Sequence, residues 1–133
     1  MKLLNRRVQF MILGLWVPVV LLLFKLIEDR SLAAVLAGVG FIVWPLLFLV
    51  LEFKFRSFTL YSKIHRVGCL QFLILFAIPL FAVRILNWGV PFSELSLAGV
   101  RASTIHQYSN GSYLIMIIMV AMSSYEDLKK KNR

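Results

Sequence analysis

Cysteine and acidic side chains are both scarce in this sequence. The single cysteine, Cys69, excludes a disulfide within the chain and any Cys-x-x-Cys motif. There are 6 aspartates and glutamates against 15 lysines and arginines, and none of the 6 falls inside a long apolar run except Glu126 and Asp127, at the very end of the last one. Because proton-coupled transport usually uses a carboxylate within the membrane, the sequence argues against a transporter of that class.

Residues that could build a metal or catalytic site are also few. The two histidines, His65 and His106, are predicted on opposite sides of a membrane, so they cannot share a metal ion. We expect each of them to be a surface or interfacial side chain. The serines near His106 lack a nucleophile motif, and Cys69 is interpreted either as an acylation site or as a partly buried thiol. We therefore predict no cofactor, no metal ion and no enzymatic activity.

Long apolar runs make up most of the chain. Of its 133 residues 60% are hydrophobic, whereas soluble domains are nearer half apolar. A helix needs about 20 apolar residues to cross the hydrocarbon core, and four runs approach that length: 8–27, 32–51, 69–88 and 112–128. The last run is strongly apolar only in its first half, so a re-entrant or interfacial segment is the alternative there. We predict an all-α fold, a polytopic membrane protein with four transmembrane helices in two hairpins that form a single integral membrane domain.

The positions of the basic residues predict the orientation. Lysines and arginines gather before the first run, in the connector 52–66 and after the fourth run. Those of the connector are Lys54, Arg56, Lys63 and Arg66. The two other loops, the second of them residues 89–111, contain only Arg30 and Arg101. By the positive-inside rule both termini and the connector are cytoplasmic, and 89–111 is an outer loop.

This orientation also explains the formal net charge of +9. Basic segments that flank membrane spans face anionic lipid head groups, so we expect the bilayer, rather than nucleic acid, to be their partner. The predicted location is the bacterial cell inner membrane.

Small residues cluster at the start of the second run. They are Ala33, Ala34, Ala37 and Gly38, and a spacing of four places them on one face of a helix. Either they form a packing face that a partner backbone approaches closely, or they reflect the general frequency of such residues in membrane helices. We favour a packing face that contacts another membrane protein or a second copy of this chain.

Two basic residues lie inside apolar runs. Lys25 and Arg84 stand near the ends of the first and third runs, where their long side chains could reach the outer interface. The alternative is a role in binding an anion or a partner.

Two short motifs recur about 60 residues apart, which suggests a duplicated hairpin. Residues 8–13 resemble 70–75, and the sequence Leu-Ala-Gly-Val of 36–39 returns at 97–100. Chance matching between leucine-rich segments is the alternative.

These patterns predict a small multi-pass membrane protein without catalytic activity. A helper or interaction protein fits them best. The alternative is a small oligomeric transporter or channel in which Arg84 and Lys25 attract anions to the outer end.

Overall fold

The computed structural model describes residues 2–132, most of which are helical. Four rods form the fold: α1 (Arg6–Leu26), α2 (Arg30–Phe55), the continuous pair α3 (Leu60–Phe72) and α4 (Ile78–Leu86), and α5 (Ala102–Ser123). The smaller elements are 3-10 turns at Lys2–Leu4 and Phe92–Glu94, strands β1 (Ser96–Leu97) and β2 (Val100–Arg101), and α6 (Tyr125–Lys131). Among residues 2–132, three rods are long and apolar enough to cross a membrane: α1, α2 and the rod Leu60–Leu86. The prediction of a helical fold is confirmed.

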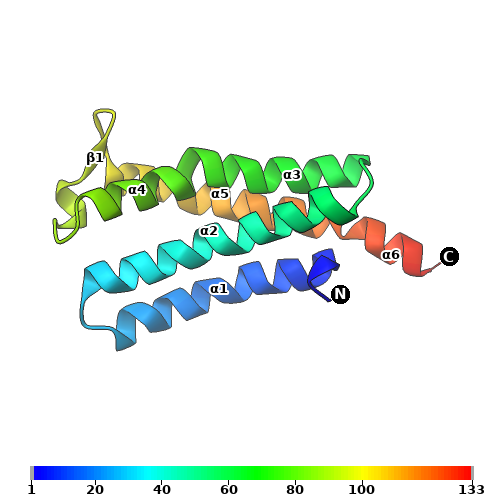
Figure 1. Ribbon diagram of the computed structural model, residues 1–133, viewed down its shortest axis with the longest axis horizontal. Helices are drawn as coiled ribbons and strands as arrows, with labels where there is room; N and C mark the ends of the chain where they lie inside the picture. Colours follow the sequence, from blue (N-terminus) through cyan, green and yellow to red (C-terminus); the bar gives the residue numbers. More distant parts are fainter. Residues whose placement is uncertain (1, 133) are drawn as a thin grey trace.

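The rods run back and forth along one long axis (Figure 1). Both ends of the chain and the loop 56–59 lie at one end of the bundle, which we call the terminal end. The loop 27–29 and the hairpin of β1 and β2 lie at the other end, which we call the hairpin end. The α1–α2 pair and the α4–α5 pair separate from one another toward the hairpin end.

Polar side chains mark where the rods begin. The side chains of Asn5, Asp29 and Thr59 accept hydrogen bonds from backbone N–H groups in the first turns of α1, α2 and α3. Such caps satisfy donors that a helix leaves unpaired at its start. Because the loops before α2 and α3 are short, each rod must return beside the one before it.

The third rod contains an irregular turn before Pro79. A proline removes the hydrogen bond to the carbonyl four residues earlier and crowds that carbonyl. Here the carbonyl belongs to Leu75, within the π-helical segment Leu73–Ala77 that joins α3 to α4. A π-helical turn relieves this crowding without ending the helix, so the rod continues to Leu86.

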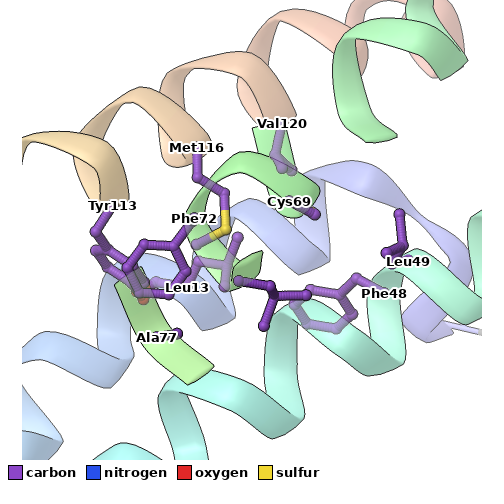
Figure 2. Packing of buried hydrophobic residues seen from close by; sticks show 10 residues of the cluster. Leu13, Phe48, Leu49, Cys69, Phe72, Ala77, Tyr113, Met116 and Val120 are labelled. Carbon is purple, nitrogen blue, oxygen red and sulfur yellow. The ribbon is translucent and has the colours of Figure 1, made fainter. Parts of the chain in front are cut away.

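All four rods contribute to one apolar core in the middle of the bundle (Figure 2). Leu13 comes from α1, Phe48 from α2, Cys69 and Phe72 from α3, and Met116 from α5. Each of these side chains is at most 2% exposed. A second, smaller cluster at the hairpin end joins α4 and α5 to the segment between them.

Helices extend beyond the boundaries predicted from hydropathy. α2 continues to Phe55 and α3 begins at Leu60, so only 56–59 of the predicted connector lies outside helices. α5 begins at Ala102, inside the predicted outer loop, and ends at Ser123. Its 22 residues would extend roughly 33 Å, so the helix is long enough to cross although its first half is polar. The apolar runs predicted these rods but not their ends, because the helices continue through polar residues that hydropathy assigns to loops.

The repeated sequence Leu-Ala-Gly-Val adopts two different conformations. At 36–39 it lies within α2, whereas at 97–100 it forms the hairpin turn between β1 and β2. Ala98 and Gly99 there have φ angles of 52° and 81°, the left-handed geometry of a tight hairpin. This part of the proposed duplication has no structural counterpart.

Candidate functional site

The small-residue face of α2 lies inside the bundle. Ala33, Ala34 and Ala37 are at most 5% exposed. A Cβ atom added to Gly38 would lie 2.7 Å from Cδ2 of Phe81, a residue of α4. This face therefore points into the bundle, where Gly38 approaches α4 and where Ala34, Ala37 and Gly38 also line a cavity.

A buried ion-pair cluster closes the terminal end. Arg6, fully buried at the start of α1, donates through Nη2 and Nε to Glu52 of α2, with Nε 3.3 Å from Oε2. Its Nη1 atom donates to Glu126 of α6 at 2.6 Å and to the carbonyl of Ser123 at 3.1 Å. One guanidinium thus joins three of the rods.

A second arginine strengthens this attachment of α6. Arg56 donates to both carboxylate oxygens of Asp127, at 2.6 and 3.0 Å, and to the Leu4 carbonyl at 2.8 Å. The Thr59 hydroxyl donates to Glu126 at 3.2 Å. Bidentate arginine–carboxylate contacts fix geometry as well as charge, so α6 is held in one position.

Opposing effects act on the Glu126 carboxyl. Burial alone would raise its pKa, but the hydrogen bond and charge of Arg6, together with Lys130, hold the pKa below its ordinary value. The carboxylate is therefore charged at neutral pH and maintains the contact with Arg6.

His65 is not the surface or interfacial side chain expected from the sequence. It is fully buried in α3, with Nε2 2.6 Å from Oε1 of Gln9 and Nδ1 3.9 Å from Oε2 of Glu52. The Gln9 amide nitrogen donates to the Leu3 carbonyl at 2.8 Å, so its oxygen is free to accept from His65. The expectation was wrong because α3 begins at Leu60 and carries His65 into the bundle.

Cys69 and His106 occupy different environments. Among residues 2–132, no group of three histidine, cysteine, aspartate or glutamate side chains could hold a metal ion. Cys69 is fully buried in the apolar core, which leaves no space for an attached acyl chain. His106 lies toward the hairpin end, where its ring meets the Phe92 ring edge-on at 5.7 Å between centroids.

A cavity of about 740 Å³ lies between the rods in the half of the bundle nearer the hairpin end. Its walls come from α1, α2, α4 and α5 and are mostly apolar. Polar side chains on the lining are Arg84, His106, Ser109 and Asn110.

Three aromatic rings on the lining of this cavity contact one another. The Tyr113 ring lies 5.1 Å from those of Phe41 and Phe72, measured between centroids, in tilted or edge-on contacts. The Tyr113 hydroxyl donates to the Leu13 carbonyl and so ties α5 to α1 at this level. Phe72 and Tyr113 also belong to the apolar core, so the cavity borders that core directly.

A smaller cavity of about 430 Å³ adjoins the first. The two share Phe24, Ala34, Arg84 and Phe92, and the smaller one adds Arg30 and the polar side chains of Ser31 and Asn87. The Arg84 guanidinium carbon stacks 4.1 Å from the centroid of the Phe92 ring. No salt bridge within residues 2–132 involves Arg30 or Arg84.

The two candidate intramembrane charges have different surroundings. Lys25 is exposed on α1 and is not among the described residues that line either cavity, whereas Arg84 lines both. They therefore do not line one path in a single chain. The connector cations Lys54 and Lys63 are exposed at the terminal end, and Arg66 stacks 4.1 Å from the centroid of the Phe53 ring.

Sequence reasoning missed the ion-pair cluster. Arg6 and Glu52 flank apolar runs and Asp127 stands at the end of one, where charges usually indicate exposed loops. Glu52 and Asp127 each lie close to a basic cluster. The predicted topology places both clusters on the same side as Arg6, and this was the signal that the sequence offered.

Comparisons with protein-family models, with curated proteins and with solved structures found no match to this chain. Its function must therefore be inferred from its own geometry. The ion-pair cluster and the pair of cavities are the two features that bear on it.

Proposed function

We propose that this chain is a non-catalytic, multi-pass membrane protein that binds an apolar or amphiphilic ligand between its two helical hairpins. The observation that carries this proposal is the 740 Å³ cavity. Ligand sites typically measure about 300–1,000 Å³ and combine apolar walls with a few polar groups, as this cavity does. A protein that holds such a ligand would act as a helper or interaction protein within the membrane.

The proposed topology is four crossings with both termini in the cytoplasm. It is supported by three apolar rods, by the length of α5, and by the position of both chain ends at the terminal end (Figure 1). The basic clusters of the connector and of α6 lie at that same end, which the positive-inside rule assigns to the cytoplasm. The proposed location is the bacterial inner membrane.

The ion-pair cluster supports a structural role for the charged residues. Arg6, Glu52, Glu126 and Asp127 use their charges on one another or on Arg56. A transport role has less support, since the apolar core occupies the bundle between the larger cavity and the terminal end. A transport path would require the hairpins to move apart through that core.

Filling the cavity tests the proposal. Ala34 is buried and lines both cavities, so Ala34→Leu places three extra carbons within them. The matched control is Ala82→Leu, which adds the same atoms to an exposed position on α4. The measurement is native mass spectrometry of protein released from phosphatidylcholine nanodiscs, counting the lipid molecules that stay bound.

We expect the unaltered chain and Ala82→Leu to retain one lipid and Ala34→Leu to lose it, with all three equally helical by circular dichroism. Equal retention by the three proteins, or no retention by any of them, would contradict a binding role for the cavity.

A further inference from the structure

We infer that the ligand of this cavity is an anionic amphiphile, with its alkyl chain in the larger cavity and its phosphate or carboxylate head in the smaller one between Arg84 and Arg30. This inference depends on the proposed function, because it specifies what the cavity binds. The paired cavities, their charge and their position each support it.

The two cavities have complementary characters. The larger is lined mainly by aliphatic and aromatic side chains, among them the contacting rings of Phe41, Phe72 and Tyr113. The smaller has a more polar lining, to which Arg30, Ser31 and Asn87 contribute. Since both share Arg84 and Phe92, a molecule with an apolar tail and a polar head could occupy the two at once.

The charge of the lining favours an anion. Both cavities together present Arg84 and Arg30, and no aspartate or glutamate occurs among the described residues of either lining. Because neither arginine belongs to a salt bridge within residues 2–132, both guanidinium groups are available to an external oxyanion. Arginine presents several N–H donors in a planar fork that matches phosphate and carboxylate oxygens.

Phe92 orients one of these arginines. Its ring face lies 4.1 Å from the Arg84 guanidinium carbon, and the ring belongs to the 3-10 turn just beyond the hairpin end of α4. A stacked guanidinium keeps its N–H donors in the plane of the group, directed past the edge of the ring. Arg84 therefore needs little reorganisation to receive a head group, which lowers the cost of binding.

The dimensions suit a long alkyl chain. From Arg84 to Phe72 the rod advances roughly 18 Å, at about 1.5 Å per residue. Arg84 lies two residues before the end of α4, so the head group would be near the membrane surface and the tail would point toward the middle of the bundle. This is the orientation of a lipid in the surrounding leaflet.

Competition between two head groups tests the inference. The protein is reconstituted in nanodiscs that contain equal amounts of phosphatidylglycerol, an anionic lipid, and phosphatidylcholine, a zwitterionic one, with identical acyl chains. Native mass spectrometry then measures the ratio of the two lipids that stay bound. The variants are Arg84→Gln and Arg30→Gln, and the matched control is Lys25→Gln, which removes a charge from an exposed position near the hairpin end.

We expect the unaltered chain and Lys25→Gln to prefer phosphatidylglycerol. Arg84→Gln should lower that preference roughly tenfold, as expected for the loss of one charge-assisted contact, and Arg30→Gln should lower it as well. Added palmitate distinguishes the source of the anion: displacement of the bound phosphatidylglycerol would show that a free carboxylate suffices, and no displacement would show that the phosphate head is required.

The failures of the two proposals are distinguishable. Retention of one lipid without preference between the head groups, or a preference that neither arginine substitution alters, would overturn the anionic ligand and leave the binding role intact. Loss of all bound lipid from the unaltered chain would overturn both. The comparison of head groups in the unaltered chain is decisive even if an arginine variant fails to fold.

Discussion

Arg6 shows how one buried charge can join the two ends of a chain. Its guanidinium meets Glu52 and Glu126, which are 46 and 120 residues away in sequence. A buried charge is costly to place in the interior unless it is paired, and removing one partner leaves the other uncompensated. The free energy of unfolding should therefore depend far more on Arg6 than on its exposed neighbour Arg7.

We expect Arg6→Met to lower the free energy of unfolding by about 3–5 kcal/mol, because Glu52 would remain buried without a partner. Arg7→Met is the control and should be nearly neutral, since Arg7 is exposed. Reversible unfolding in mixed detergent measures both. Equal stability of the two variants would show that the buried pair contributes nothing.

The ion pair of Arg6 with Glu126 should also make stability depend on pH. The pKa of Glu126 is lower in the folded chain than its ordinary value of 4.5, so its contribution is present at neutral pH and is lost as the pH falls below that value. In melting curves from neutral to strongly acidic pH, the difference between the unaltered chain and Glu126→Gln should shrink. A difference that stays constant or grows on acidification would contradict this assignment.

At the scale of elements, α3 and α5 are in close contact where α3 has a glycine. A Cβ atom at Gly68 would lie 2.9 Å from the Cβ atom of Met119, closer than two such atoms normally approach. At Gly14 on α1, by contrast, an added Cβ meets no described atom within 4 Å. The two glycines therefore form a matched pair for testing helix contact.

We expect Gly68→Ala to lower the free energy of unfolding by about 1–3 kcal/mol, because the helices must move apart or distort to admit the methyl group. Gly14→Ala should be neutral or slightly stabilising, since alanine favours a helix more than glycine does. Thermal unfolding followed by circular dichroism compares them. If Gly68→Ala melted no lower than Gly14→Ala, the close approach of α3 and α5 would be wrong.

Hydropathy predicts a helix only where the helix is apolar, so the helices differ in how much of each could be predicted from the sequence. The runs that became α1 and the rod Leu60–Leu86 contain enough apolar residues to predict a helix from composition. The first turns of α5 could not be predicted in this way, because their polar residues are typical of a loop. Part of α5 is held by tertiary contacts, such as the hydrogen bond between the Ser112 hydroxyl and Gln71 of α3, which hydropathy does not record.

At the scale of the whole molecule, the bundle predicts which segments share a side of the membrane. The loop 56–59 and the C-terminal end of α6 lie together at the terminal end, and β1 lies at the hairpin end (Figure 1). Ser57, Ser96 and Asn132 are exposed at these three places and suit single cysteine substitutions. The native Cys69 is fully buried and should not react in the folded chain.

In intact cells we expect a membrane-impermeant maleimide to label Ser96→Cys and to spare Ser57→Cys and Asn132→Cys, which should react only after the membrane is opened. The chain with only its native cysteine is the control for background labelling. Reaction of Ser57→Cys and Asn132→Cys from opposite sides would exclude four crossings.

The succession of helices and the segregation of basic residues were determined by the sequence itself. An apolar rod needs only its own length and composition to favour hydrocarbon. A basic cluster needs only its place beside such a rod to favour one side of a membrane. The burial of His65, the pairing of Arg6 with Glu52, and the position of Arg84 and Arg30 on the lining of one cavity were decided by the tertiary structure. These features join side chains from different rods, so they exist only once the rods have packed against one another.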